Sequence, residues 1–218
     1  MKQKEIFLQD EGDAWYLRNA QALAERDLAT DDPVIPQVRR VLESYDDDAG
    51  SKPRRLLEVG CGDGRRLAWL QQHLGLEVSG LEPSGKAVAA AAGIGVSARC
   101  GTADELPYDD GQFDILIFGF CLYLCDDQDL FRIAAEADRV LKSDAWLIIH
   151  DFYSQAPTRR EYHHRPGIYS RKMDCASMFA WHPSYTCVHS QIRHHEHLAY
   201  TDDPQEWVAT QVLRKHAQ

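Results

Sequence analysis

The chain has 218 residues, of which 44% are hydrophobic, enough to bury one good-sized core and too few to require two. Its formal net charge of −10 argues against a protein held on nucleic acid by clustered lysines and arginines. No stretch approaches the length of a membrane span, and residues 1–13 lack the apolar segment of a signal peptide. We therefore expect a cytoplasmic protein, monomeric or homodimeric.

Two helices are predicted at the N-terminus. Residues 13–28 place hydrophobic side chains at roughly helical spacing, with Asp13 as a cap. A second helix is expected to begin at Asp32, with Pro33 in its first turn. The acidic, glycine-containing stretch at 45–53 then reads as a linker.

The most informative stretch is residues 54–64, RRLLEVGCGDG. Its apolar run predicts a buried strand that breaks into Gly60, Gly62 and Gly64 just before the helical pattern of residues 65–74. Glycines at alternate positions allow the backbone conformations of a tight turn, so that a ligand can sit against the main chain at a helix N-terminus. The stretch therefore predicts a strand, a ligand-binding turn and a helix.

Two kinds of ligand suit such a turn. A dinucleotide fingerprint needs Gly or Ala at position 65, where this chain has Arg65. A carboxylate just ahead of Gly-x-Gly-x-Gly, here Glu58, instead resembles the turn of the class I S-adenosylmethionine-dependent methyltransferases. The resemblance implies S-adenosyl-L-methionine as cofactor and S-adenosyl-L-homocysteine as product. It also implies that Glu58 orients the cofactor's ammonium group and that Gly60, Cys61 and Gly62 pass under its amino-acid end.

A second acidic residue, Glu82, ends the strand predicted at 76–82. Nucleoside-binding αβ units place an acidic residue about 20 positions after the glycine turn, on the ribose hydroxyls. Glu82, followed by Pro83, is therefore expected at the ribose. Ser84 is expected to cap the next helix, which ends at Gly93.

The segment GTADELPYDDGQFD resembles the family's adenine-binding loop, in which an Asp and a small residue precede Leu-Pro and then Phe-Asp. Here Thr102 stands at the place of the Asp. We therefore expect the adenine to be bound mainly through Ala103, with Thr102 and Asp104 as further candidates.

Further apolar runs predict the rest of a sheet. The expected strands are 96–100, 115–118, 145–152, 185–192 and 206–213, and a helix is expected at 127–141. The predicted fold class is α/β, a Rossmann-like three-layer α/β/α sandwich whose seven-stranded, mostly parallel sheet has an antiparallel C-terminal strand. A terminal helix over 204–214 is the alternative, because Asp203, Pro204 and Glu206 also form a helix-start pattern.

Residues after the strand ends are candidates for the site, because ligands of open parallel sheets lie beyond the carboxyl ends of the strands. Phe118 and Phe120 are expected near the cofactor, and Tyr123 near the acceptor. If the N-terminal helix folds over the cofactor as a lid, Tyr16 and Arg18 could reach the cofactor's carboxylate.

A hydroxyl acceptor would also need a general base. His163 and His164 are favoured, since they belong to the irregular acceptor-side region and imidazole titrates near neutral pH. Tyr123, His150 and Asp151 are the other candidates.

Seven histidines lie between residues 163 and 197, which raises the question of a metal. On a strand His195 and His197 would share a face, as metal ligands can. However, HHEH sits next to a turn in a polar stretch and nothing fixes a third ligand, so no metal is expected. The six cysteines, scattered without a Cys-x-x-Cys pair, read as free thiols.

The sequence thus predicts a single domain, residues 1–218, with three parts: an N-terminal helical lid (1–50), a cofactor-binding core (54–151), and an acceptor-side insertion with the terminal strands (152–218). The expected activity is methyl transfer to an oxygen or nitrogen of a small molecule, such as a sugar or natural-product intermediate. An RNA or protein methyltransferase, and a non-catalytic cofactor-binding partner subunit, remain as alternatives.

Overall fold

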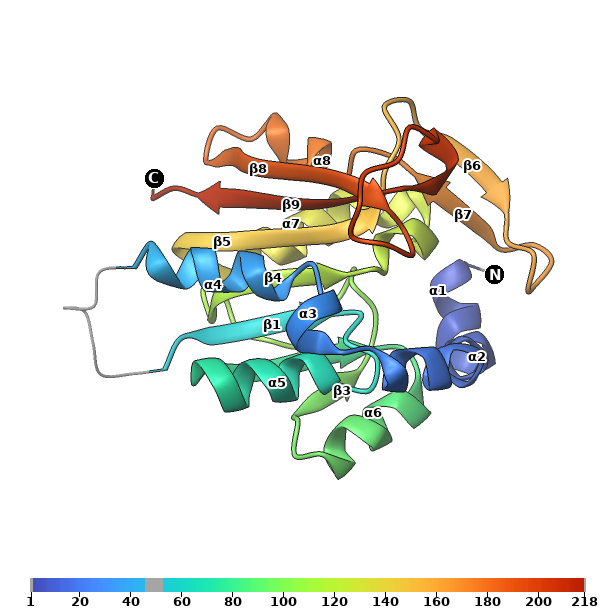
Figure 1. Cartoon of the computed structure of the whole chain (residues 1–218), viewed down its shortest axis with the longest axis horizontal. Coiled ribbons are helices and arrows are strands. Elements are labelled where there is room, and N and C mark those ends of the chain that lie inside the picture. The colour runs from blue at the N-terminus through green and yellow to red at the C-terminus, as the bar shows by residue number, and fades with distance from the viewer. Residues whose placement is uncertain (1, 46–52, 218) are drawn as a thin grey trace.

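A computed structural model describes residues 2–45 and 53–217 of the chain (Figure 1). Most of the predicted linker at 45–53 lies outside the described residues. The described chain forms a seven-stranded sheet in the order β3-β2-β1-β4-β5-β9-β8. Its strands are β1 (Arg55–Val59), β2 (Glu77–Glu82), β3 (Ala98–Cys100), β4 (Phe113–Gly119), β5 (Leu141–Phe152), β8 (Tyr185–His194) and β9 (Trp207–Lys215).

The sheet is parallel from β3 to β5, and β9 runs antiparallel to both of its neighbours. This confirms the predicted Rossmann-like sheet with an antiparallel C-terminal strand. The alternative of a terminal helix is wrong: only Pro204–Glu206 form a 3-10 turn, capped by Asp203, and the chain then continues as β9. The β-branched residues and Trp in this stretch favour an extended chain once it can pair with both β5 and β8.

Helices cover both faces of the sheet. They are α1 (Gln3–Ile6), a π-helical stretch (Phe7–Glu11), α2 (Gly12–Glu25), α3 (Leu28–Asp31), α4 (Ile35–Glu43), α5 (Arg65–Leu74), α6 (Gly85–Gly93), α7 (Leu130–Val140) and α8 (Ser177–Ala180). One core packs α4, α5 and α6 against the sheet, and the other packs α7 and α8 against its opposite face. Because the central strands are buried on both faces, they appear in the sequence as continuous apolar runs.

Several local signals act as the sequence indicated. Gly75 ends α5 in the left-handed conformation, and the Ser84 side chain accepts a hydrogen bond from Ala87 N at the start of α6. Asp32 Oδ1 accepts from Val34 N and Ile35 N at 2.8 and 3.0 Å, but the N-cap position of the second helix is Val34 rather than the predicted Asp32. That helix begins at Ile35 rather than near Pro33.

Asp13 does not cap its own helix, contrary to the prediction. The chain is already helical upstream, so Asp13 lies inside α2. Its Oδ1 instead accepts hydrogen bonds from Ser84 Oγ and Lys86 N, at 2.7 and 3.0 Å. Those bonds lower the pKa of Asp13 and fasten α2 across the start of α6.

The region after β5 contains a hairpin that the sequence did not indicate. Strands β6 (Thr158–Glu161) and β7 (Tyr169–Lys172) pair with each other and form a separate two-stranded sheet. Both strands are mainly polar, which explains why no apolar run marked them. Among residues 2–45 and 53–217, no helix combines the length and the apolar character that crossing a bilayer requires.

Gly64 should be the least replaceable of three glycines in this part of the fold. It has φ +75°, and a Cβ there would lie 3.0 Å from Ala91 Cβ and 3.1 Å from Val96 Cγ1. We predict that Gly64→Ala lowers the free energy of unfolding by about 1–2 kcal/mol for the left-handed backbone and by about 1–3 kcal/mol more for overpacking. Chemical denaturation measures the loss.

Two control variants separate these causes. Gly95 has φ +80° but open space around its Cβ position, so Gly95→Ala should show the backbone cost alone. Gly93, inside α6 with neither constraint, should tolerate Ala or be stabilised by it. Equal losses for Gly64→Ala and Gly95→Ala would show that the close packing does not matter.

Candidate functional site

A cavity of about 510 Å³ lies at the carboxyl ends of β1, β2, β4 and β5. Its wall includes Glu58 and Val59 at the end of β1, Glu82 at the end of β2 and His150 near the end of β5. Helix α2 and the segment between β8 and β9 close it from other sides. This is the position that ligands of open α/β sheets occupy.

The glycine turn forms one wall of the cavity. Gly60 has φ +76° and donates its N–H to Leu81 O at 2.8 Å, while a Cβ on it would lie 2.6 Å from Cys121 Cβ. Gly62 has φ +53°, and among the described residues no atom comes within 4 Å of its Cβ position. Gly60 thus lets the strands approach each other, whereas Gly62 leaves space on the cavity side. Cys61 also lies on the wall.

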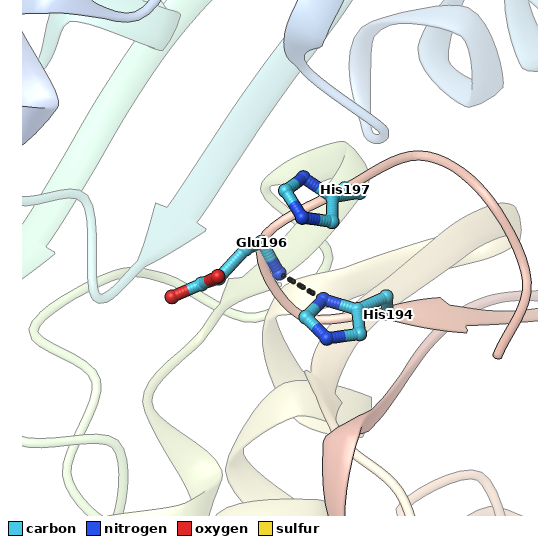
Figure 2. Close-up of side chains that lie close together, drawn as sticks. All are labelled: His194, Glu196 and His197. Carbon is cyan, nitrogen blue, oxygen red and sulfur yellow. Dashed lines mark hydrogen bonds between the residues drawn. The ribbon is translucent and has the colours of Figure 1, made fainter. Parts of the chain in front are cut away.

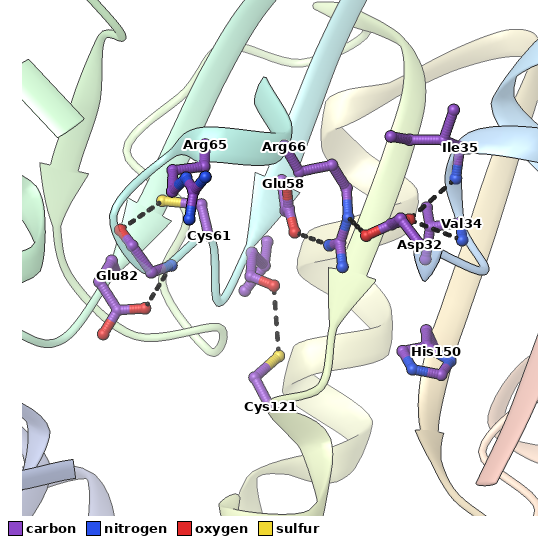
Figure 3. A network of polar contacts seen from close by, with 12 residues as sticks. Asp32, Val34, Ile35, Glu58, Cys61, Arg65, Arg66, Glu82, Cys121 and His150 are labelled. Atoms are coloured by element: carbon purple, nitrogen blue, oxygen red, sulfur yellow. Dashed lines mark hydrogen bonds and ion pairs between the residues drawn. The ribbon is translucent and has the colours of Figure 1, made fainter. Parts of the chain in front are cut away.

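Glu58 belongs to a buried network of three charges (Figure 3). Arg66 donates to Asp32 Oδ2 at 2.8 Å through Nε and forms an ion pair with Glu58 Oε1. The other carboxylate oxygen, Glu58 Oε2, is buried and lacks a hydrogen-bond partner in the described part of the chain. Burial raises the pKa of Glu58 to about 7, against the lowering effect of Arg66. A buried acceptor oxygen therefore remains free beside the glycine turn.

Glu82 is held by the backbone of the turn. Its Oε2 accepts from Gly62 N and its Oε1 from Ser84 N, both at 3.0 Å. Burial raises its pKa to about 6, and these two bonds oppose the rise. Pro83, next along the chain, lies on the same wall. The carboxylate is thus fixed, with further lone pairs available to a ligand's hydroxyl groups.

Thr102, Ala103 and Asp104 form the neighbouring wall. Thr102 Oγ1 donates to Asp104 Oδ1 at 2.8 Å, and Asp104 also forms an ion pair with Lys4 of α1. Although burial raises the pKa of Asp104, the bonds from Lys4 and Thr102 bring it below its ordinary value. The sequence contained no signal for Lys4, because its contact joins segments 100 positions apart.

The two phenylalanines after β4 are placed differently. Phe120 has φ 63° and lies on the cavity wall, where its ring packs against those of Phe152 and His150. Phe118 is fully buried in the core within β4 and is not on the wall. Alternate strand residues face opposite sides, and Phe118 faces the α7 side of the sheet.

Two of the predicted catalytic residues, Asp151 and Tyr123, do not line the cavity. Asp151 supports the loop after β4, and Tyr123 belongs to that loop. Asp151 accepts hydrogen bonds from Leu122 N, Tyr123 N and Phe152 N at 2.7, 3.3 and 2.7 Å. Burial raises its pKa to about 7. Tyr123 is buried, its hydroxyl accepts from Trp15 Nε1 at 3.1 Å, and burial raises its pKa.

The other predicted site residues also lie off the wall. His163 and His164 are exposed in the turn between β6 and β7, with ring centroids 3.7 Å apart. Arg18 forms an ion pair with Glu11 at 2.5 Å and donates to Tyr162 Oη at 3.1 Å. Tyr16, on the same helix, is likewise absent from the wall.

Helix α2 presents a different face to the cavity from the one proposed for Tyr16 and Arg18. Gly12, Trp15, Asn19 and Ala22 line it, and so does Arg26 just after the end of the helix. Their spacing of three or four residues is that of one helix face, so the periodicity was visible in the sequence. What the sequence lacked was a signal that this face, rather than its neighbour, turns towards the ligand.

His150 is a further wall residue, but both of its ring nitrogens are occupied. Nδ1 lies 3.0 Å from Thr210 Oγ1, and Nε2 lies 3.5 Å from a nitrogen of buried Arg193. Since arginine only donates, Nε2 is the acceptor and Nδ1 carries the proton. Burial lowers the pKa of His150 to about 3, so it stays neutral and has no free nitrogen for proton transfer.

Comparison with known proteins agrees with this geometry. Residues 57–149 match the model of a family described as a methyltransferase domain. This central part of the chain is therefore similar to methyltransferase domains. The matched segment runs from within β1 to within β5 and contains Glu58, Glu82 and the loop at 102–104.

A curated relative of the chain is the norajmaline N-methyltransferase of Rauvolfia serpentina, 30% identical over 58% of this chain and 45% of the relative. The chain thus matches less than half the length of that protein. The fold is shared with the 1,6-didemethyltoxoflavin N1-methyltransferase of Burkholderia thailandensis, which was solved with S-adenosylhomocysteine. The TM-score is 0.62 at 19% sequence identity, and the match covers 94% of this chain and 89% of that chain. A Haloferax volcanii protein described as a putative methyltransferase was solved with the Trm112 activator. It has a TM-score of 0.68 at 18% identity, and the match covers 97% of this chain and 98% of that chain.

Arg66 should be essential to the stability of the site. Replacing it with Met leaves Asp32 and Glu58 as buried carboxylates without their shared cation. We predict that Arg66→Met costs about 3–5 kcal/mol in the free energy of unfolding, the usual effect of breaking a buried ion pair from one side.

Arg65→Met is the matched control. The neighbouring Arg65 donates to Leu23 O at 2.7 Å and forms no ion pair in the described residues. Its replacement should cost about 1 kcal/mol, the contribution of a single hydrogen bond. Denaturant unfolding of both variants compares them, and similar losses would mean that the buried network is not what Arg66 stabilises.

Proposed function

We propose that the protein transfers a methyl group from S-adenosylmethionine to an oxygen or nitrogen of a small molecule. The observation that carries the proposal is the cavity that joins Glu58, Glu82 and residues 102–104 around the glycine turn. In this proposal Glu58 holds the ammonium group, Gly60, Cys61 and Gly62 lie under the amino-acid end, and Glu82 accepts from the ribose hydroxyls. Ala103, Thr102 and Asp104 border the adenine.

Three features of the structure suit this ligand. Glu58 Oε2 is a buried acceptor without a hydrogen-bond partner among residues 2–45 and 53–217, so it can receive a cationic group. Gly62 leaves open space against the main chain. The volume of about 510 Å³ falls within the range of small-molecule sites.

A methyl group on a sulfonium is already activated, so the protein's task is to align the acceptor and to exclude water. Phe120 and Phe152, with ring centroids 4.8 Å apart, form an apolar wall beyond the glycine turn. The N-terminal helices would act as a lid, since α2 is fastened to α6 through Asp13 and Lys4 reaches Asp104.

The names of the relatives support a small-molecule acceptor. Two of the matching plant enzymes are named as N-methyltransferases of ajmaline and norajmaline, and the Burkholderia protein methylates N1 of 1,6-didemethyltoxoflavin. Because the chain matches less than half of the plant enzymes, their acceptors are not transferred to it. The names of these relatives favour nitrogen as the acceptor atom, and the proposal also includes oxygen.

An activator-dependent methyltransferase is the second candidate, and it would accommodate an RNA or protein acceptor. Its support is the similarity to the Haloferax volcanii protein, which was solved with the Trm112 activator and is matched over 98% of its length. Turnover of small molecules by the isolated chain would favour the first candidate.

Glu82→Gln should weaken binding of S-adenosylmethionine at least tenfold, about 1.4 kcal/mol. The substitution removes the negative charge that receives the ribose hydroxyls. Isothermal titration calorimetry measures the affinity. Glu77→Gln, at the exposed opposite end of β2, is the control and should bind as tightly as the wild type. An unchanged affinity in Glu82→Gln would remove this residue from the ribose.

Cofactor affinity should rise with pH through about 7. The raised pKa of Glu58 means that the free protein holds a proton there below that pH, whereas a bound ammonium group requires the carboxylate. Binding near pH 7 should therefore release a proton, which calorimetry in buffers of different ionisation enthalpy detects. Glu58→Gln should abolish this release, and equal binding enthalpies for the wild type in all buffers would contradict the assignment.

A further inference from the structure

The segment after β8 brings three histidines and two glutamates to the edge of the cavity. His195 and Glu196 lie on the wall itself. The prediction that these residues sit next to a turn is confirmed, because β8 ends at His194 and the chain then bends. The rings of His195 and His197 both stack on that of His194, with centroids 5.0 and 4.9 Å away.

The hydrogen-bond pattern fixes the tautomer of His194. Its Nδ1 accepts from the backbone N–H of Glu196 at 3.0 Å (Figure 2). A neutral imidazole has one donor and one acceptor nitrogen, so Nε2 of His194 carries the proton. That nitrogen lies 3.9 Å from Glu206 Oε2.

This tautomer argues against a metal ion. Ligand atoms of His194, His195 and Glu206 lie within 4.8 Å of one another, as do those of His194, Glu196 and His197. Both sets depend on His194, and a metal needs a ring nitrogen with a free lone pair. His194 has none, because Nδ1 is bonded to the backbone and Nε2 is protonated.

His195 lies close to both glutamates. Its Nδ1 is buried and lies 2.5 Å from Glu206 Oε2, without the geometry of a hydrogen bond, and its Nε2 lies 3.6 Å from Glu196 Oε1. Its backbone N–H donates to Glu206 O at 2.9 Å, which holds the two residues together. Glu206 is therefore the carboxylate nearest to a histidine ring that lines the cavity.

We propose that His195, oriented by Glu206, is the general base for an acceptor that must lose a proton. This rests on the proposed methyl transfer. The acceptor heteroatom forms a bond to the methyl carbon, the carbon–sulfur bond breaks with its electron pair going to sulfur, and the acceptor's proton moves to Nε2 of His195. Glu206 then neutralises the imidazolium.

The surroundings define the class of acceptor. Phe152, whose ring centroid lies 6.3 Å from that of His195, and Phe120 offer an apolar wall beside the base. This suits a flat ring that carries a hydroxyl or an N–H, and it does not suit a carboxylate or phosphate acceptor, which needs no base. The other wall histidine, His150, has both nitrogens occupied.

The first test needs no acceptor. Nitrogen NMR of the full chain with ¹⁵N-labelled histidine should show neutral His195 protonated at Nδ1, and Glu206→Gln should reduce that preference. Protonation at Nε2 in the wild type would overturn the proposal. Calorimetry with Zn²⁺ alone is the companion measurement: micromolar binding that His194→Gln abolishes would show a metal site and would equally overturn it.

The second test uses turnover of a panel of phenols and secondary amines with methyl-labelled S-adenosylmethionine. His195→Gln should lower kcat about 100-fold or more, the usual contribution of a general base, and should remove the acidic limb of the pH profile without changing cofactor affinity. The charged groups around His195 that shape this limb are His194, Glu196, Glu206 and Lys172, the last of which interacts with Glu206.

The controls keep the two proposals distinguishable. Glu206→Gln should lower kcat more than KM changes, as expected of a positioning residue, and His197→Gln, exposed and off the wall, should match the wild type. Turnover that His195→Gln leaves unchanged would overturn the base. Failure of the wild type to bind S-adenosylmethionine would instead sink the proposed function, while the NMR result would still decide the His195 tautomer.

Discussion

The arrangement of the site depends on a buried carboxylate at the end of β1. Glu58 is almost completely shielded from solvent, and its charge is tolerable only because Arg66 lies against one of its oxygens. Arg66 is in turn fixed by Asp32, which also accepts a hydrogen bond from Ile35 N at the start of α4. The helix that precedes the sheet, the first strand and the helix after the glycine turn are therefore joined by a single guanidinium. In the described part of the chain, the network leaves Glu58 Oε2 as an unpaired acceptor beside the turn. Burial disfavours the negative charge that Glu58 must carry when a cation binds, and it therefore raises the pKa of this carboxyl group.

The cofactor half of the cavity was largely predictable from the sequence because its signals are local. The run from Arg54 to Gly64 specifies a strand, a turn and a helix within a few residues, and Glu82 follows at the spacing that a single αβ unit dictates. Continuous apolar runs revealed the central strands because burial on both faces removes the alternation of polar and apolar residues. Residues 56–59 and 115–118 show this most clearly.

The remainder depends on contacts between distant segments, which a single sequence does not encode in any readable pattern. Lys4 reaches Asp104, Trp15 reaches Tyr123, and Glu206 reaches His195 only after the sheet has formed. The polar hairpin of β6 and β7 had no apolar signal. The acceptor-side histidines illustrate the difficulty: His163 and His164 stood out by composition, yet a bend after β8 takes His195 to the cavity instead.

The two halves of the cavity therefore divide the proposed chemistry. In the proposal, the glycine turn with Glu58 and Glu82 binds the methyl donor, and the segment between β8 and β9 holds the base for the acceptor's proton. The central claim is that the protein binds the methyl donor. Isothermal titration calorimetry of the full chain with S-adenosylhomocysteine tests this claim most directly. The account predicts saturable binding of one molecule per chain, and absence of binding at millimolar concentration would contradict it.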